Sequence, residues 1–165
     1  MKYRIEERAG LRLVGCKFPV SVTGGLNYDE IPSIWNSLPK ETFDELYALS
    51  DGEPTGVLGV FGEKHYNGSE YTGFDYWIAA STSKPCPQTY GVIDIPAATW
   101  AVFEAKGPAP GSIQDVFKRL YSEWFQSAEY ERRWEVYELE WFSIGIPSSD
   151  SYICEAWVPV VKKTG

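Results

Sequence analysis

The order of the hydrophobic patterns along the chain constrains the fold most strongly. A β-branched, apolar segment at residues 11–22 predicts a strand, and residues 30–49 have helical spacing. Residues 56–62 and 71–80 predict two further strands, and the same order of elements returns in residues 90–161. One helix on an antiparallel sheet covers one face of that sheet. We therefore expect an α+β fold of two strand-helix-strand-strand repeats with antiparallel sheets.

A short motif supports an internal duplication. The segment Asp75–Ala79 lies 80 residues before Glu155–Pro159, and each has an acid, a tryptophan two places later and then an apolar residue. We expect a single domain over residues 1–165 with a pseudo-two-fold relation between its repeats. The expected boundaries are about 1–81 for repeat one, about 82–89 for a proline-containing linker and about 90–163 for repeat two. If the halves pair, their uncovered faces form a central groove for a ligand.

Local signals mark the ends of several elements. Asp29 can cap a helix that begins near Glu30, and Pro39 predicts a break in the helical pattern. The clearest helix covers Ser112–Ser127, and the turn at Asn67–Ser69 predicts a hairpin.

The segment Trp134–Phe142 is predicted to be a strand whose side chains alternate between two faces. Tyr137, Leu139 and Trp141 share the face that suits packing under a helix. The opposite face, which we assign to the groove, carries Trp134, Val136, Glu138, Glu140 and Phe142. The alternative is that this face is in water and its acids are solvated.

If Glu140 lies in the groove, a bound cation would compensate its charge, and aromatic faces would add about 0.5–2 kcal/mol per well-placed ring. Aromatic residues make up 16% of the chain, which fits either a stiff core or rings that line a pocket. A buried carboxylate can also act as a general acid or base.

Charge and motifs narrow the function classes. Fifteen basic against twenty-three acidic residues give a net charge of −8, without the basic footprint of a nucleic-acid-binding protein. Three separated cysteines and the lone His65 form no metal-ligand set, and we expect no metal and no organic cofactor. No signal peptide or membrane span is recognisable, so a cytoplasmic protein without membrane contact is expected.

Several segments, taken in order, carry a family resemblance: Ile31–Trp35, Tyr76–Ala79, Ile95–Glu104, Ser112–Phe125, Tyr137–Phe142 and Cys154–Val160. In these segments the chain resembles the gyrase-inhibitor-like (GyrI-like) small-molecule-binding family. This family includes the effector-binding domains of AraC-type and multidrug-responsive regulators. The chain departs from the family pattern at Gln126–Tyr130, where a turn with proline and glycine is expected, and at the unusual Glu131–Arg133 that follows.

The resemblance implies two repeats around a ligand cleft and a stand-alone binder of apolar or cationic small molecules. The glutamate that faces the ligand corresponds to Glu140, or to Glu138 if the register is off by two. The family's cleft aromatics correspond to Trp35, Tyr76, Trp100 and Trp124.

Three functions follow as hypotheses. The first is a module that sequesters or senses hydrophobic, often cationic, compounds. The second is a hydrolase of cyclopropane-containing toxins, implied by some family members, in which Glu140 is catalytic and Tyr76 assists. The third is a protein-interaction or inhibitor module with a partner that the sequence does not identify.

Overall fold

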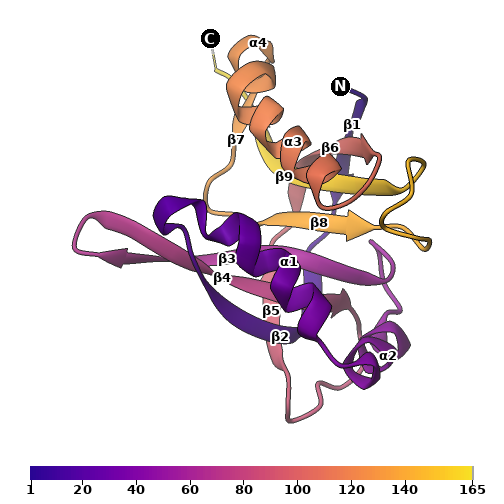
Figure 1. Ribbon diagram of the computed structural model, residues 1–165. Coiled ribbons are helices and arrows are strands. Elements are labelled where there is room, and N and C mark those ends of the chain that lie inside the picture. Colours follow the sequence, from indigo (N-terminus) through magenta and orange to yellow (C-terminus); the bar gives the residue numbers. More distant parts are fainter. Residues whose placement is uncertain (165) are drawn as a thin grey trace. The chain divides into compact units, whose positions relative to one another are not determined.

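The fold is described from a computed structural model, which places residues 1–164 (Figure 1). The chain forms two compact units, each of which combines helices with an antiparallel sheet. Unit 2 is the continuous stretch Leu11–Ile95. Unit 1 combines Met1–Gly10 with the chain from Pro96 onward. The expected α+β class and the antiparallel sheets are confirmed.

Unit 2 follows the expected strand-helix-strand-strand order and adds one strand. Its elements are β2 (Leu11–Ser21), η1 (Thr23–Gly25), α1 (Asn27–Ser37), α2 (Lys40–Leu49), β3 (Val57–Asn67), β4 (Glu70–Ser81) and β5 (Gly91–Ile95). The strands pair in the order β3-β4-β2-β5. The predicted hairpin turn joins β3 to β4, and the helical pattern breaks at Pro39 as expected.

Unit 1 has the same order with two added strands, β1 at its N-terminal end and the short β7 before β8. Its elements are β1 (Tyr3–Arg8), β6 (Ala98–Lys106), α3 (Gly111–Arg119), η2 (Leu120–Trp124), α4 (Phe125–Ser127), β7 (Tyr130–Arg132), β8 (Glu138–Phe142) and β9 (Ile153–Lys162). The strands pair in the order β1-β6-β9-β8, and β7 also pairs with β9.

The start of α1 corrects the expected helix cap. The helix begins at Asn27, the cap position is Leu26, and no side chain caps it. Gly24 and Gly25 adopt positive φ angles of 62° and 75° in the preceding turn, which brings the chain into helical geometry earlier than expected. Asp29 therefore lies in the first turn, where a negative charge complements the helix dipole.

The predicted strand Trp134–Phe142 is too long by four residues. Only Glu138–Phe142 forms a strand, because the chain turns between Trp134 and Tyr137. The guanidinium of Arg132 donates a hydrogen bond of 2.8 Å to the Val136 carbonyl and a second to the carbonyl of Arg133, which holds this turn. The strands β1 and β7 were not predicted, because β1 is polar and largely exposed and β7 is a polar segment of only three residues.

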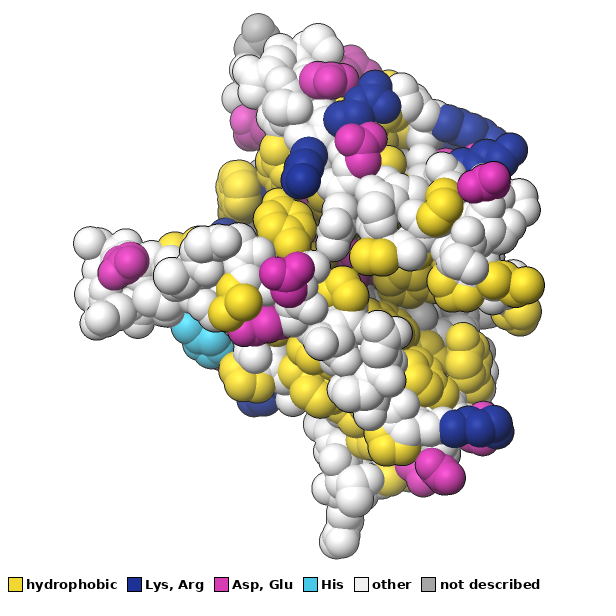
Figure 2. All heavy atoms as spheres, viewed as in Figure 1, with side chains coloured by type: hydrophobic (Ala, Val, Ile, Leu, Met, Phe, Trp, Pro, Cys, Tyr) yellow, Lys and Arg dark blue, Asp and Glu magenta, His cyan; other side chains and the backbone are white. Residues whose placement is uncertain are grey.

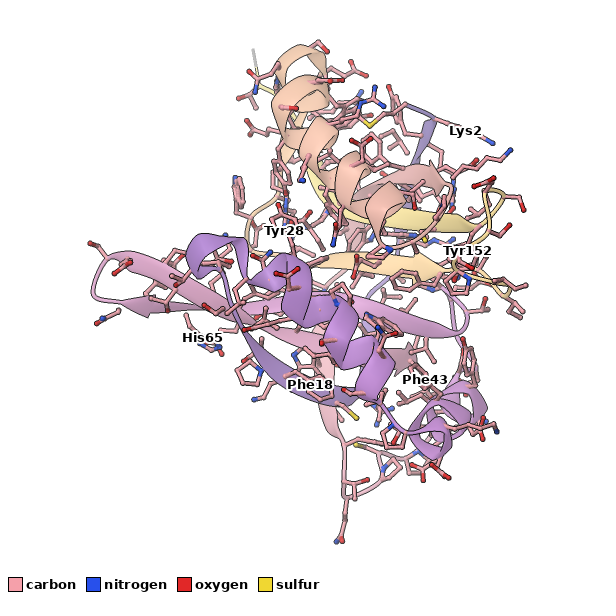
Figure 3. The ribbon with its side chains drawn as sticks, in the orientation of Figure 1. Lys2, Phe18, Tyr28, Phe43, His65 and Tyr152 are labelled. Atoms are coloured by element: carbon pink, nitrogen blue, oxygen red, sulfur yellow. The ribbon has the colours of Figure 1, made fainter. Side chains whose placement is uncertain are left out.

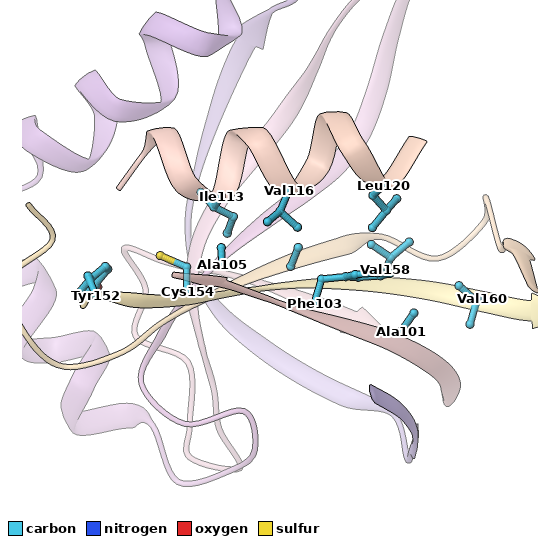
Figure 4. Close-up of a cluster of buried hydrophobic side chains, with 11 residues drawn as sticks. Ala101, Phe103, Ala105, Ile113, Val116, Leu120, Tyr152, Cys154, Val158 and Val160 are labelled. Atoms are coloured by element: carbon cyan, nitrogen blue, oxygen red, sulfur yellow. The ribbon is translucent and has the colours of Figure 1, made fainter. Parts of the chain in front are cut away.

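The core of unit 1 lies between the helix and the sheet. Ile113 and Val116 of α3 point from the helix onto β6 and β9, and Leu120 continues this row (Figure 4). Burying each such side chain contributes about 1.5–3 kcal/mol. Small sheet residues, Ala105 and Ala156 among them, allow the helix to pack close to the strands.

The repeated acid-tryptophan motif has the same physical surroundings in both units. On β4, the Lys17 Nζ lies 4.0 Å from a carboxylate oxygen of Asp75 and 5.9 Å from the ring centroid of Trp77. On β9, an Arg4 nitrogen lies 2.7 Å from the carboxylate of Glu155, and its guanidinium lies 5.8 Å from the ring of the tryptophan two places later. The two segments that lie 80 residues apart therefore each contribute to a cluster of a cation, an acid and an indole ring, one in each unit.

Among residues 1–164, no helix combines the length and the apolar character that a bilayer span requires.

Candidate functional site

The two acids of β8 lie on the helix-covered face of the unit 1 sheet. Glu140 is 6% exposed and pairs across the sheet with Ala156, a member of the core under α3. Phe142 pairs with Cys154 and packs on the same core. We expected the helix over the opposite face, and that assignment is wrong.

The helix covers this face of the sheet, and not the expected one, because the side chains on the two faces differ in size. The face away from the helix carries the large rings of Trp100 and Trp157, whose centroids lie 5.9 Å apart. The helix face instead has alanines at 101, 105 and 156, which leave room for a helix.

Glu138 belongs to a buried polar cluster of three residues. The Tyr121 hydroxyl donates a hydrogen bond of 2.9 Å to Glu138 Oε1. Nη2 of Arg132 lies 3.6 Å from the same oxygen, and the Arg132 and Glu138 side chains are only 7% and 15% exposed. Burial, followed by the negative charge of Glu138, raises the pKa of Tyr121 above its ordinary value. The hydroxyl therefore stays protonated and can donate the hydrogen bond to Glu138.

An exposed tryptophan adjoins this cluster. The Trp134 side chain is 63% exposed, and the guanidinium of Arg132 lies 5.3 Å from its ring centroid. The ring of Tyr121 stacks on Trp134 with centroids 6.3 Å apart and an interplanar angle of 26°. Tyr121 lies in the π-helical segment η2, a wider turn that often occurs at functional sites.

Cys154 is close enough to Glu140 for the charge of the glutamate to affect the thiol. Burial, followed by the negative charge of Glu140, raises the pKa of the Cys154 thiol to about 12. The thiol is fully buried in the core between helix and sheet, so it is an unreactive core group at neutral pH.

In unit 2, the predicted residues Trp35 and Tyr76 contact each other directly. Trp35 Nε1 donates a hydrogen bond of 2.9 Å to the Tyr76 hydroxyl oxygen. Tyr76 is fully buried, and Phe61 meets its ring edge to face at 5.5 Å. Phe43 of α2, which is labelled in Figure 3, stacks on Trp35 at 5.9 Å. This aromatic group lies on the helix-covered face of the unit 2 sheet.

The other two predicted aromatics have different surroundings in unit 1. Trp100 is fully buried beside Trp157, on the face that lacks Glu140. Trp124 lies on the helix side, where its ring meets those of Phe103 and Tyr3 at 4.9 and 5.3 Å. The structure thus places Trp124, Glu138 and Glu140 on the same face of the unit 1 sheet and leaves Trp100 on the other.

A separate open pocket of about 470 Å³ lies between α1 and β2 in unit 2. Its lining consists of Phe18, Pro19, Asp29, Glu30, Ser33, Ile34 and Ser37. None of the predicted site residues contributes to it. The Glu30 carboxylate also accepts a hydrogen bond from the Ser21 backbone N–H at 3.0 Å.

The single histidine is an exposed residue with a buried partner. His65 Nε2 lies 2.8 Å from Asp75 Oδ1, and its side chain is 44% exposed (Figures 2 and 3). Within residues 1–164, no three histidine, cysteine or acidic side chains gather in a group that could hold a metal ion. On the face shown in Figure 2, basic side chains are interspersed with acidic ones.

The model of the GyrI-like small molecule binding domain matches residues 1–161. The chain belongs to this GyrI-like family. No curated protein matches the sequence significantly.

Solved structures share the GyrI-like fold over nearly the whole chain. SAV2435 bound to tetraphenylphosphonium is 25% identical, with a TM-score of 0.82 over 98% of this chain and 94% of that chain. A protein from Staphylococcus aureus MU50 is also 25% identical, with a TM-score of 0.78 over 97% and 98% of the two chains. The C-terminal domain of EcmrR is 19% identical, with a TM-score of 0.65 over 98% of each chain, and shows the fold alone.

Sequence reasoning missed the roles of Arg132 and Tyr121. Tyr121 lies within the predicted helix Ser112–Ser127, where a hydroxyl group gives no periodic signal. The Glu131–Arg133 run, which departs from the family pattern, was the available signal for Arg132.

Proposed function

We propose that this GyrI-like domain binds hydrophobic organic cations, with Glu140 facing the positive charge and aromatic rings contacting the apolar surface. Family membership supports a small-molecule ligand. The 25% identical SAV2435, which aligns over 98% of this chain, was solved with the hydrophobic cation tetraphenylphosphonium.

The observation that carries the proposal is the position of Glu140. The residue is 6% exposed and lies on the helix face of β8, next to Ala156 and Cys154. Attraction between opposite charges is stronger in such a low-dielectric setting than in water. A lipophilic cation loses little hydration there and gains a close counter-ion, whereas an anion of the same shape is repelled.

Aromatic side chains supply the apolar contacts in the proposal. On the helix side of unit 1 we assign this role to Trp124, which is half-buried against Phe103 and Tyr3. In unit 2 we assign it to the hydrogen-bonded Trp35 and Tyr76. A ring face next to a desolvated cation contributes about 2 kcal/mol.

Calorimetric titration with a pair of ions of matched shape tests the proposal. Tetraphenylphosphonium and tetraphenylborate have similar size and opposite charge. We expect saturable binding of the phosphonium, and at least tenfold weaker binding of the borate. Glu140→Gln removes the charge with little change in volume and should weaken phosphonium binding at least tenfold, or about 1.4 kcal/mol.

The matched control is Glu135→Gln. This carboxylate precedes β8, is 68% exposed and pairs with Arg133 at the surface. Its replacement should leave the affinity unchanged. Equal affinity of wild type and Glu140→Gln would remove the role of Glu140. Absence of saturable binding of both tetraphenylphosphonium and rhodamine 6G would overturn the proposed function.

A further inference from the structure

The strand β1 leaves one edge of the unit 1 sheet open. Within residues 1–164 it stands at the end of the strand order, and β6 pairs with one of its two edges. Across this pair, the Glu104 backbone N–H donates a hydrogen bond of 3.0 Å to the Lys2 carbonyl. Because backbone groups alternate in direction along a strand, the N–H and C=O groups of Tyr3, Ile5 and Glu7 point away from β6. Each of these three residues therefore presents one donor and one acceptor at the open edge.

This edge lacks the common devices that prevent a strand from pairing. Proline residues and β-bulges usually serve that purpose. The six residues of β1 contain no proline, and its register with β6 runs without a shift from Tyr3 to Arg8. Tyr3 is 48% exposed and Ile5 is 36% exposed, so two large apolar side chains contact water at this edge. A further strand would satisfy the open backbone groups and bury apolar surface.

Charged side chains follow the face of β1 that carries Trp157. Arg4 and Arg8 lie 5.8 and 5.5 Å from the Trp157 ring centroid, and their nitrogens lie 2.6 and 2.9 Å from the carboxylate of Glu6. Arg4 donates through Nε to Glu6 and through Nη1 to Glu155. Since a guanidinium has five N–H donors, Arg4 can also bind a carboxylate on a neighbouring strand.

We propose that β1 is a homodimer interface, in which it pairs antiparallel with β1 of a second copy about a two-fold axis at Ile5. The outward backbone groups of Ile5 then meet those of Ile5 in the second copy, and those of Tyr3 meet those of Glu7. On the other face, Arg4 lies directly opposite Glu6 of the second copy, and the symmetry repeats this pair. Opposite charges at facing positions stabilise antiparallel strands. This inference goes beyond the proposed function and does not depend on it.

The order of charges selects one register for this pairing. The outward backbone groups can bond to one another only if the strands are displaced by an even number of residues. A displacement of two residues puts Arg4 opposite Arg4 in one direction and Glu6 opposite Glu6 in the other. Like charges at facing positions are destabilising. The charges of β1 therefore oppose these displaced registers and favour the one centred on Ile5.

Sedimentation equilibrium of the full chain measures the dissociation constant of the dimer. We expect the mass to rise from 18.6 kDa toward twice that value as the protein concentration increases. Ile5→Pro removes an outward N–H that β6 does not use, and an edge strand tolerates proline there. The variant should keep the wild-type circular dichroism spectrum and dissociate at least tenfold more readily. The matched control is Val92→Pro, at a 44% exposed position of β5, which should leave the dissociation constant unchanged.

Charge reversal tests the facing pairs. Arg4→Glu places acids opposite each other, and Glu6→Arg places bases opposite each other, so each variant alone should dissociate at least tenfold more readily than wild type. In an equimolar mixture of the two variants, every facing pair joins an acid to a base. The mixture should therefore form a heterodimer at least tenfold more tightly than either variant associates with itself, which a folding defect could not produce.

Disulfide crosslinking tests the register. The two Ile5 α-carbons would lie about 5.5 Å apart across the axis, which suits a disulfide. The two Glu7 α-carbons would lie about 14 Å apart, four residues out of register. Copper-phenanthroline oxidation should therefore join two chains of Ile5→Cys, but not of Glu7→Cys or of wild type with its three native cysteines.

Three results would overturn the proposal. One is a monomeric mass of wild type at every concentration, which would mean that a second copy does not close this edge. Another is a dimer that persists unchanged in Ile5→Pro and in both charge variants, because it would use a different surface. The third is crosslinking of Glu7→Cys without crosslinking of Ile5→Cys, which would contradict the axis at Ile5.

Discussion

The two units join helix to sheet through a tyrosine hydroxyl, but with opposite chemistry. In unit 2 the sheet residue Tyr76 accepts a hydrogen bond from Trp35 of α1, and the surrounding side chains are aromatic. In unit 1 the helix-side residue Tyr121 donates to Glu138 of the sheet, and a buried arginine completes the group. One arrangement of strands and helices thus supports a neutral aromatic contact in one unit and an ionic cluster in the other.

The neutral contact of unit 2 and the ionic cluster of unit 1 contribute differently to the free energy of unfolding. A neutral hydrogen bond contributes about 1 kcal/mol to stability, and its loss leaves a small desolvation cost. A buried ion pair adds little net stability compared with apolar residues, yet removing one partner is expensive because the other charge stays buried. The unit 1 cluster should therefore be the more fragile to single substitutions, and its value lies in the charge pattern that it fixes.

The largest expected effect follows from breaking the ionic cluster. Glu138→Ala leaves the 7% exposed Arg132 side chain without its carboxylate and should lower the free energy of unfolding by about 3 kcal/mol. Urea denaturation followed by circular dichroism measures the change. The double variant Arg132→Met with Glu138→Leu should recover most of the loss. A loss no greater than that of a neutral hydrogen bond would show that the cluster is not effectively buried.

An intermediate effect is expected from alkaline pH at Cys154. The unfolded thiol releases its proton near pH 9, whereas the folded thiol holds it to about pH 12. The unfolded state is therefore favoured progressively between these values, by about 1.4 kcal/mol per pH unit. Between pH 9 and pH 10.5, wild type should lose about 2 kcal/mol more stability than Cys154→Ala.

The corresponding control in unit 2 is Cys16→Ala, which removes a half-buried thiol from β2. Burial and then Glu45 raise the pKa of the half-buried Cys16, but by less than burial raises that of the fully buried Cys154. The pH dependence of unfolding in Cys16→Ala should stay close to that of wild type. Identical slopes in wild type and Cys154→Ala would contradict the expected pKa.

The smallest effect is expected from the neutral contact. Tyr76→Phe removes the acceptor of the Trp35 indole N–H and should lower the free energy of unfolding by about 1 kcal/mol. The same urea titration measures it, and Lys40→Ala, at an exposed helix ion pair, provides a near-neutral reference. A loss as large as that of Glu138→Ala would remove the distinction between the two units.

Sequence patterns were sufficient for most of the fold. Alternation and helical spacing predicted the central strands and helices, and Pro39 marked the break between α1 and α2. The strands β1 and β7 gave no such signal, because the largely exposed β1 needs no apolar alternation and β7 has only three residues. The turn at Trp134–Tyr137 was missed because it is held by Arg132, a contact that no local pattern encodes.

The candidate site was less accessible to sequence reasoning. Alternation correctly grouped Glu138 with Glu140 but could not say which face of the strand the helix covers. That choice depends on side-chain sizes on β6 and β9, which are neighbours only after folding. The pairing of Arg132 and Tyr121 with Glu138 likewise joins three elements through tertiary contact. The roles of Glu140 and the aromatic residues in ligand binding remain predictions.

The discontinuity of unit 1 has a consequence for synthesis on the ribosome. Unit 2 is an uninterrupted stretch, Leu11–Ile95, so it can fold as soon as that stretch has emerged. The strand β1 is made before unit 2 but pairs with β6, whose partner residues lie 90 to 100 positions later. We therefore expect residues 1–10 to stay unpaired during translation until β6 has been made, while unit 2 folds before then. The buried ion cluster then forms last, when β7, β8 and β9 have left the exit tunnel.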